Sequence, residues 1–216
     1  FDYFKDHRAP ETVFDKFLHD WTTGRIVGPF WYDAGDKGSY PTNTAMAAWL
    51  LMNLYERYPE SRASLGTTTL YEELKIGTAL MHQLILPGQK LAIAKLHTNV
   101  PAWGPCPPHA TGPCVSKTET KATYAMARTL AQLARVHLAE KQPEAAIPHY
   151  QKAMALNPGY FGSWLGAGVA QLQAGNKDRA QEWLSRSVEL LPTAPAAYYL
   201  GNIARDRGDG AKAMSY

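Results

Sequence analysis

Large and small apolar residues alternate with polar ones in a pattern that occurs twice between residues 127 and 192. The first copy runs through Leu130, Ala134, Ala146, Tyr150, Ala153 and Pro158. The second runs through Trp164, Gly168, Ala180, Leu184, Ser187 and Pro192, each 34 residues after its counterpart. Small residues let two antiparallel helices approach closely, and large ones fill the space between neighbouring helices. The pattern therefore predicts two successive helical hairpins.

Glycine and proline mark where these helices end. Gly175 lies between the two helices of the second copy, where the first copy has Lys141. Glycine adopts the left-handed conformation of such a turn at little cost. Pro158 and Pro192 lie just past the second helix of each copy, where proline blocks continuation. A third copy, with the period shortened by one residue, runs through Leu200, Gly201, Gly208 and Ala213.

This 34-residue period resembles the tetratricopeptide repeat over about residues 127–216. The resemblance implies a stack of paired helices, with copies at about 127–160 and 161–193 and a truncated one at 194–216. In this family the first helix of each pair lines a concave groove that commonly receives an extended peptide or a helix of a partner. Because a repeat cannot bury its apolar face alone, we expect the natural chain to continue past Tyr216.

Helical periodicity also covers much of the chain before the repeats. Residues 10–22 predict a short amphipathic helix, and residues 43–57 predict a strongly apolar helix with Asn43 as its N-cap. One side of the second helix carries Met46, Leu50, Asn53 and Leu54. These two segments indicate that the N-terminal part of the chain is helical as well.

A further helix is predicted over residues 70–86, where Thr69 and Glu72 form a capping box at its start. Residues 120–139 fit one long helix that leads into the repeats. We therefore predict an all-α protein of stacked helical hairpins with long Pro- and Gly-rich loops. Its expected parts are an N-terminal helical region at 1–117 and the repeats at 118–216.

Aromatic residues are concentrated in the glycine-containing stretch from residue 25 to residue 40. We weigh two interpretations of this stretch, which is predicted to be an irregular loop or a short strand pair. In one, the aromatic side chains fill the core; in the other, they form a small-molecule pocket. The candidate pocket residues are Phe30, Trp31, Tyr32 and Trp103.

Residues 98–117 are rich in proline and contain both cysteines of the chain, so they cannot form a regular helix or a central strand. Cys106 and Cys114 are separated by a short segment that turns back easily, which favours a disulfide in an oxidising compartment. Free thiols and a metal held by these cysteines with His109 are the alternatives. The metal is disfavoured because zinc normally takes four ligands at recognisable spacings.

The composition narrows the classes of partner. A formal net charge of +3 is too small to indicate nucleic acid. No apolar run is long enough to cross a bilayer, so we expect no membrane insertion. We expect no cofactor either, and an extracytoplasmic location follows from the predicted disulfide.

Catalytic motifs are absent from the sequence: it has no HExxH, no GxSxG, no glycine-rich phosphate loop and no CxxC. A site could assemble in space from His97, His109 and an acid such as Asp33 or Asp36, but nothing in the sequence requires it. We therefore favour a binding role over an enzymatic one for this chain.

The inner face of the repeats supplies the candidate partner site. The resemblance places on this face Arg128, Arg135, Leu165, Val169, Leu172, Tyr198, Asn202 and Arg205. Arginine suits carboxylates, which it holds by forked hydrogen bonds. The alternative is that the arginines are ordinary solvated positions. The Lys and Asn set with which chaperone-binding members of the family hold a terminal carboxylate is absent here.

Our functional hypothesis is an interaction or assembly module of an exported protein that holds a partner protein in this groove. The open end of the repeat stack could also join copies of the chain into a homo-oligomer. One alternative is an accessory region of a larger periplasmic enzyme whose catalytic domain lies elsewhere. The other is a small-molecule-binding protein that uses the aromatic loop.

Overall fold

The computed structural model describes residues 13–14, 26–27, 31, 40–62, 64–65, 68–84, 92–93, 96–97, 114–115 and 118–216. The chain forms two compact units, Phe1–Thr129 and Leu130–Tyr216. Across these described ranges the secondary structure is mostly α-helix, and each strand is only two residues long. The prediction of an all-α fold built of helical hairpins is confirmed.

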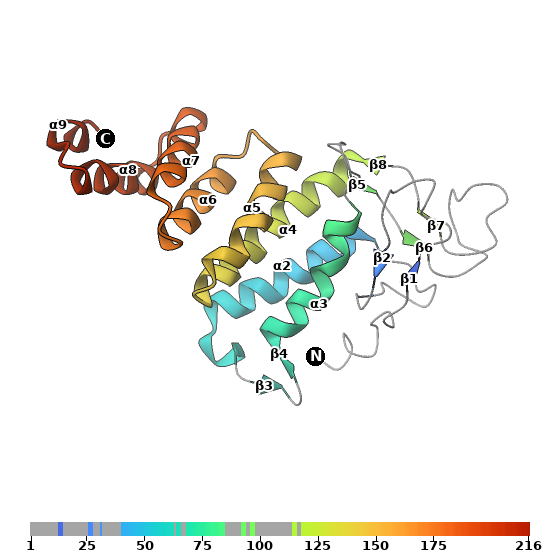
Figure 1. Ribbon diagram of the computed structural model, residues 1–216. Helices are drawn as coiled ribbons and strands as arrows, with labels where there is room; N and C mark the ends of the chain where they lie inside the picture. The colour runs from blue at the N-terminus through green and yellow to red at the C-terminus, as the bar shows by residue number, and fades with distance from the viewer. Residues whose placement is uncertain are drawn as a thin grey trace. The chain divides into compact units, whose positions relative to one another are not determined.

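The first unit contains a pair of packed helices, α2 (Pro41–Arg57) and α3 (Leu70–Gln83), joined through a 3-10 turn η1 (Pro59–Arg62) (Figure 1). Helix α2 begins at Pro41 with Tyr40 as its N-cap, so the prediction of Asn43 as N-cap is wrong. Proline is favoured at the first helical position because its φ is already helical and its missing N–H has no partner there. The N-cap therefore lies three residues earlier than the polar residues suggested.

Helix α2 buries the side opposite to the one that the apolar spacing emphasised. Ala45, Ala48, Met52 and Tyr55 are buried in the unit. Met46, Leu50 and Leu54 have 60%, 56% and 41% of their surface exposed. Apolar residues surround this helix on nearly every side, so the spacing of apolar residues could not select the buried face.

Helix α3 starts where the capping box predicted. The Oγ1 atom of Thr69 accepts a hydrogen bond from the backbone N–H of Glu72 at 3.1 Å. This bond satisfies one of the amides that a helix N-terminus leaves without an internal partner. The helix ends at Gln83, three residues before the predicted end.

Short antiparallel strand pairs also occur in the first unit. Strand β1 (Val13–Phe14) pairs with β2 (Ile26–Val27), so the helix predicted over residues 10–22 is wrong at Val13 and Phe14. The side chains that repeat at helical spacing there, Val13, Phe14 and Phe17, are also strand formers, which periodicity alone cannot separate over a short stretch. Strand β3 (Ser64–Leu65) pairs with β4 (Thr68–Thr69) just before α3.

Two further antiparallel strand pairs join residues 92–97 to residues 114–119. Strand β5 (Ala92–Ile93) pairs with β8 (Thr118–Glu119), and β6 (Leu96–His97) pairs with β7 (Cys114–Val115). Ala92 lies opposite Glu119, and His97 lies opposite Cys114. The number of residues from Ala92 to His97 therefore equals the number from Cys114 to Glu119. The two pairs thus share one register, and residues 98–113 connect its ends.

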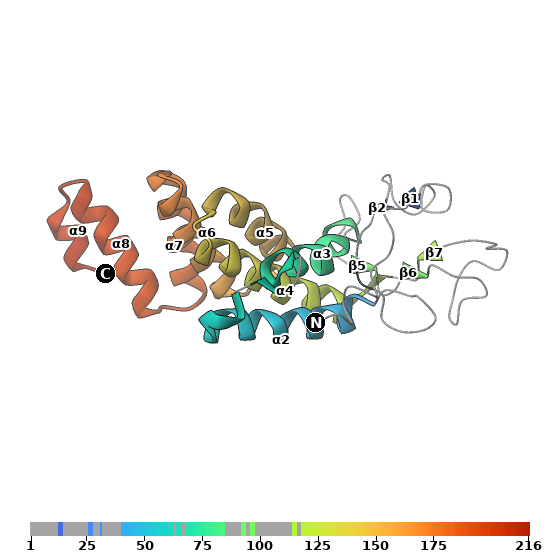
Figure 2. The same cartoon turned by 90° about the horizontal axis from the view of Figure 1, so that it is seen from below.

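The second unit is a succession of antiparallel helices that follow the end of α4 (Thr120–Ala139), a helix with the predicted bounds. The helices are α5 (Pro143–Leu156), α6 (Phe161–Gln173), α7 (Lys177–Leu190), α8 (Ala194–Asp206) and α9 (Gly210–Met214). From α5 onwards each helix packs on the next, as Figures 1 and 2 show.

The same cap ends the first helix of each hairpin. The residue with positive φ is Lys141 at 58°, Gly175 at 83° and Gly208 at 78°. In the second hairpin the N–H of Gly175 donates to the carbonyl of Leu172, and the N–H of Asn176 donates to that of Gln171. The equivalent pair of bonds occurs in the other two hairpins. The predicted left-handed turn at Gly175 is confirmed, and Gly208 is its counterpart after the shortened period.

Close approach between α6 and α7 depends on the small residues of the repeated pattern. A Cβ atom added to Gly168 would lie 2.6 Å from Cγ of Leu184, inside van der Waals contact. The core that joins this hairpin to the next consists of Ala180, Leu184, Leu200 and Ile203. Pro158 and Pro192 lie two residues past the ends of α5 and α7, as predicted.

Candidate functional site

A hollow of about 500 Å³ lies between α8 and α9 of the second unit. Its lining residues are Ala194, Ala197, Tyr198, Gly201, Asn202, Arg205, Ala213 and Tyr216. The small residues leave the space open, and the four larger ones supply its chemistry. The hollow thus combines two aromatic rings, an amide and a guanidinium.

Three of the predicted groove residues lie together in this hollow. Tyr198, Asn202 and Arg205 are spaced four and three residues apart on α8, which places them on one helix face. A guanidinium N–H of Arg205 donates to Oδ1 of Asn202 at 2.8 Å, and 65% of the Tyr198 surface is exposed. These side chains therefore face the solvent-filled hollow and are not part of the core between helices.

The predicted groove residues on α6 have a different environment. Leu165, Val169 and Leu172 are half-buried. Leu165 and Leu172 pack against the core cluster that contains Leu184 and Leu200. Much of their apolar surface therefore stabilises the junction between consecutive hairpins.

The two predicted arginines of α4 belong to different units. The guanidinium of Arg128 lies 4.8 Å from the centre of the Trp49 ring of α2, inside the first unit. Such a cation–π contact gives Arg128 a structural role at the surface of α2. Arg135 is an exposed residue of the second unit.

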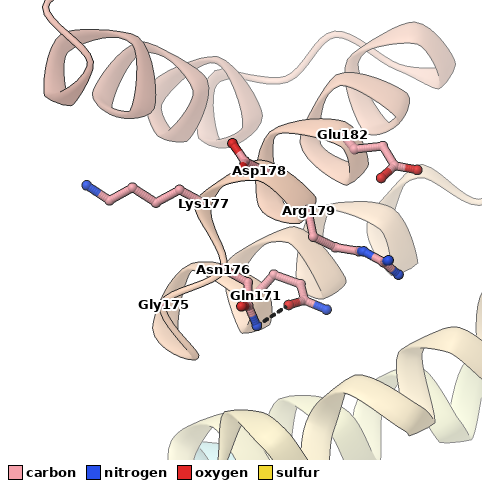
Figure 3. A pocket seen from close by; sticks show the side chains of 7 residues that line it. All are labelled: Gln171, Gly175, Asn176, Lys177, Asp178, Arg179 and Glu182. Carbon is pink, nitrogen blue, oxygen red and sulfur yellow. Dashed lines mark hydrogen bonds between the residues drawn. The ribbon is translucent and has the colours of Figure 1, made fainter.

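A second hollow, of about 770 Å³, lies at the turn between α6 and α7 (Figure 3). Its lining residues are Gln171, Gly175, Asn176, Lys177, Asp178, Arg179 and Glu182. The side-chain amide of Asn176 donates to Oε1 of Gln171 at 2.9 Å, which fixes the turn. Charged residues after a turn are usual in solvated helices, so no sequence pattern distinguishes these residues.

Charged side chains of this turn form ion pairs and hydrogen bonds that join α7 to the C-terminal end of α8. The ammonium of Lys177 lies 2.7 Å from Oδ2 of Asp206. The guanidinium of Arg207 pairs with Asp178 and also donates to Oε1 of Gln181 at 2.7 Å. The hydrogen bond and the positive charge of Lys177 lower the pKa of the Asp206 carboxyl below its ordinary value. Ion pairs between consecutive hairpins, Lys177–Asp206 and Asp178–Arg207, therefore lie beside this hollow.

Trp31 is the one predicted pocket residue that the structure describes. Its side chain is 3% exposed, and its indole Nε1–H donates to Oε1 of Glu73 at 2.8 Å. A Cβ on Gly77 would come within 2.2 Å of the indole ring, so the ring lies directly on α3. Of the two interpretations of the aromatic run, Trp31 fits the core. Phe30, Tyr32 and Trp103 lie outside the described residues.

The predicted disulfide also involves a residue outside the described ones. Cys106 is not among them, and of Cys114 only the backbone, in β7, is described. Over the described ranges no group of three His, Cys, Asp or Glu side chains is arranged to hold a metal ion. Among the helices of those same ranges, none has the length and apolar character needed to cross a membrane.

Residues 137–203 match the tetratricopeptide repeat family. The sequence match and the repeated helical hairpins agree, so this part of the chain consists of tetratricopeptide repeats. The resemblance seen in the sequence is confirmed.

Other similarities are to a cellobiosidase and to endoglucanases. Over 27 residues, 12% of this chain and 3% of the other protein, the sequence is 63% identical to a cellulose 1,4-beta-cellobiosidase of Acetivibrio thermocellus. A metagenome-derived glycoside hydrolase family 9 endoglucanase is 18% identical with a TM-score of 0.55, covering 92% of this chain and 47% of that one.

A mutant of a thermostable endoglucanase from Alicyclobacillus acidocaldarius is 15% identical with a TM-score of 0.54, covering 99% of this chain and 52% of that one. At these identities the likeness is one of fold, namely packed helical hairpins. The chain spans about half the length of both endoglucanases.

Proposed function

We propose that the repeat unit is a protein-interaction module that binds an extended peptide carrying a carboxylate in the hollow between α8 and α9. The observation that carries this proposal is that Tyr198, Asn202 and Arg205 line one hollow at the end of the tetratricopeptide repeats. Their positions follow from the repeat, and their side chains remain available for a ligand.

The chemistry of the hollow favours an acidic peptide. The guanidinium of Arg205 donates several hydrogen bonds in a planar fork that matches a carboxylate. The amide of Asn202 can bond to the peptide backbone, and the rings of Tyr198 and Tyr216 offer apolar contact area with little loss of side-chain freedom. Because the floor consists of small residues, an extended main chain can approach α8 closely.

A random peptide library selected on the wild-type protein tests this proposal. We expect the selected peptides to be enriched in Asp and Glu and to lose at least about tenfold in affinity on Arg205→Glu, since the charge is reversed at the contact. Tyr198→Ala should weaken binding as well.

Arg186→Glu is the matched control for that experiment. Arg186 is an exposed arginine of α7 that pairs with Glu189 at 2.7 Å and does not line the hollow. Peptides that bind the Arg205→Glu and Arg186→Glu variants equally well would exclude the hollow as the binding site.

We propose as a second function that the chain is part of a larger glycoside hydrolase acting on β-1,4-glucan. It is supported by the 63% identity over 27 residues with a cellobiosidase and by the fold likeness to two endoglucanases. The repeats would then be the interaction module of a larger carbohydrate-acting protein.

The sequence offers a pair of acids suited to this chemistry. Asp33 and Asp36 follow the aromatic run Phe30–Tyr32 within a few residues. Glycoside hydrolysis commonly uses two carboxyl groups, one to protonate the leaving oxygen and one to activate water or attack the sugar. Two acids beside several aromatic residues are the signal in the sequence that points to this chemistry.

Hydrolysis of cellohexaose by the natural full-length protein tests this second function. Asp33→Asn and Asp36→Asn should each reduce kcat by at least about a hundredfold, because each removes an acid or base and keeps the side-chain volume. Glu60→Gln, which changes an exposed acid of η1, is the control. Hydrolysis that persists unchanged in both aspartate variants would rule out their assignment.

An extracytoplasmic location forms part of this proposal, because a polysaccharide such as cellulose does not cross a membrane. A disulfide between Cys106 and Cys114 agrees with it, since such bonds persist in oxidising compartments. Thiol titration of the unfolded protein should find no free thiol without reductant and two after reduction. Two free thiols without reductant would exclude the disulfide.

A further inference from the structure

The hydrogen bond between Arg205 and Asn202 fixes which end of the Asn202 side chain is left for a ligand. Nη2 of Arg205 donates to Oδ1 of Asn202 at 2.8 Å. The oxygen and nitrogen of an amide group can exchange places by rotation of the side chain, but a guanidinium group has donors and no acceptor. The atom that contacts Arg205 is therefore the oxygen, and the NH2 group of Asn202 is turned away from the guanidinium.

The carboxylates that follow Arg205 in the sequence have partners elsewhere. Asp206 is the next residue, but its Oδ2 atom pairs with the ammonium of Lys177 on α7 at 2.7 Å. Asp209 caps α9, where its Oδ1 atom accepts from the backbone N–H of Lys212 at 3.0 Å. Among the ion pairs of the residues that the structure describes, none includes Arg205. Its positive charge is therefore available to an acid of another molecule.

The polar end of the hollow, formed by Asn202 and Arg205, thus offers hydrogen-bond donors only. The NH2 group of the amide and the remaining N–H groups of the guanidinium are all donors. A ligand satisfies this end best with two neighbouring acceptors, and a peptide segment with an acidic residue has them in its carboxylate and in the adjacent main-chain carbonyls. A lysine ammonium has no acceptor, and an amide side chain has one acceptor atom where a carboxylate has two.

We infer that Asn202 is a specificity-determining residue of the hollow: it holds a main-chain carbonyl beside the acidic side chain that Arg205 binds, and its neutral side chain keeps Arg205 available for that acid. This inference rests on the proposed peptide-binding function. An aspartate at position 202 would have nearly the same shape, but it would pair with Arg205, which lies three residues later on the same helix face. It would also repel the carboxylate of the peptide. The amide is therefore the group that lets a single arginine select an acidic peptide.

Titration of this chain with a blocked peptide, acetyl-Ala-Ala-Asp-Ala-Ala-amide, followed by heteronuclear NMR, tests the inference. The same peptide with Asn in place of Asp is the reference, and wild type should bind it at least about tenfold more weakly. Asn202→Ala should weaken binding of the Asp peptide about threefold to tenfold, because one hydrogen bond is lost. Asn202→Asp should weaken it by more than about tenfold, because Arg205 is then neutralised and the peptide repelled. Asn43→Asp, which adds the same charge at an exposed position of α2, is the matched control and should stay within about twofold of wild type.

Thioamide forms of the Asp peptide test the carbonyl contact directly, because sulfur is a much weaker hydrogen-bond acceptor than oxygen. The two carbonyl groups that flank the Asp side chain are replaced one at a time. One of the two replacements should weaken binding to wild type about threefold, and the same replacement should have no effect on binding to Asn202→Ala, as a double-mutant cycle requires of two groups in contact.

The outcomes separate the residue from the site. Equal affinity of wild type for the Asp and Asn peptides would overturn the proposed peptide-binding function, and the role of Asn202 with it. If wild type selects the Asp peptide but Asn202→Ala binds it as tightly as wild type does, the role of Asn202 is overturned and the proposed function stands. A thioamide loss that persists in Asn202→Ala would have the same meaning. Circular dichroism checks that each variant is folded, and Asn202→Ser replaces Asn202→Ala if the latter is not.

Discussion

Glycine at position 168 lies where the backbone of α6 comes nearest to α7. An alanine there would place its Cβ 2.6 Å from Leu184, whereas at Gly201, the counterpart in the next hairpin, the nearest atom is the Ala213 carbonyl oxygen at 3.4 Å. The same sequence pattern therefore has different steric consequences in consecutive repeats.

We predict that Gly168→Ala lowers the free energy of unfolding by about 1–3 kcal/mol, because Leu184 must move out of its preferred packing. Gly201→Ala is the matched variant and should be neutral or stabilising by up to about 1 kcal/mol, since alanine is the better helix former. Urea unfolding followed by circular dichroism measures both. Equal losses in the two variants would contradict the steric explanation.

The helix caps differ in one residue that matters for stability. Lys141 has a φ of 58°, which is unfavourable for a side chain with a Cβ, while Gly175 adopts a similar conformation freely. We predict that Lys141→Gly raises the free energy of unfolding by up to about 1 kcal/mol and that Gly175→Ala lowers it by about 1 kcal/mol. Thermal melts of the two variants should shift in opposite directions, and shifts of the same sign would refute the prediction.

At the scale of elements, α7 and α8 are joined by an apolar core and by exposed ion pairs. Lys177 lowers the pKa of Asp206, so the folded state holds the ionised carboxylate more strongly than the unfolded state does. This contribution is present at pH values above the ordinary pKa of aspartate, near 4, and is lost as the pH falls through the lower pKa of the folded state.

We therefore predict that the stability difference between wild type and Asp206→Asn is greatest above about pH 4 and shrinks as the pH falls below it. Added salt should reduce the same difference, because the pair is exposed and screened by ions. The measurement is the melting temperature of both proteins between about pH 2.5 and about pH 7. This range extends about 1.5 units below and about 3 units above the ordinary pKa of aspartate. A difference that grows on acidification would contradict this origin.

On the scale of the whole molecule, the two units have separate sets of buried residues. Met52 of α2 is fully buried in the first unit, and Leu184 of α7 is fully buried in the second. Each unit therefore contains fully buried residues of its own.

We predict that Met52→Ala costs about 2–5 kcal/mol and speeds amide exchange mainly in α2 and α3. Leu184→Ala should cost a similar amount and act mainly on α6 to α8. Leu50→Ala is the control: its side chain is 56% exposed on the same helix as Met52 and should change stability by less than about 0.5 kcal/mol. Uniform loss of protection along the whole chain in either core variant would disprove separate cores.

Interactions between residues close together in the sequence were sufficient to predict the turns and helix ends of the repeats. Pro158, Pro192 and the left-handed turn at Gly175 act through the backbone of the residue itself or its nearest neighbours, so their consequences could be predicted from the sequence. The small residues at the helix crossings act between helices, and they were predicted from the repeated pattern. The capping box of Thr69 and Glu72 belongs to the same class, since its bond spans only three residues.

Contacts between distant residues were decided by the tertiary structure alone. The apolar spacing of α2 favoured the side that is exposed, because only the partner helix selects which of several apolar faces is buried. Trp31 lies 42 positions from Glu73, and no local pattern relates an aromatic residue of a loop to an acid inside a helix. Likewise, the repeat placed Tyr198, Asn202 and Arg205 on one face, but the hollow beside them exists only because α9 folds back along α8.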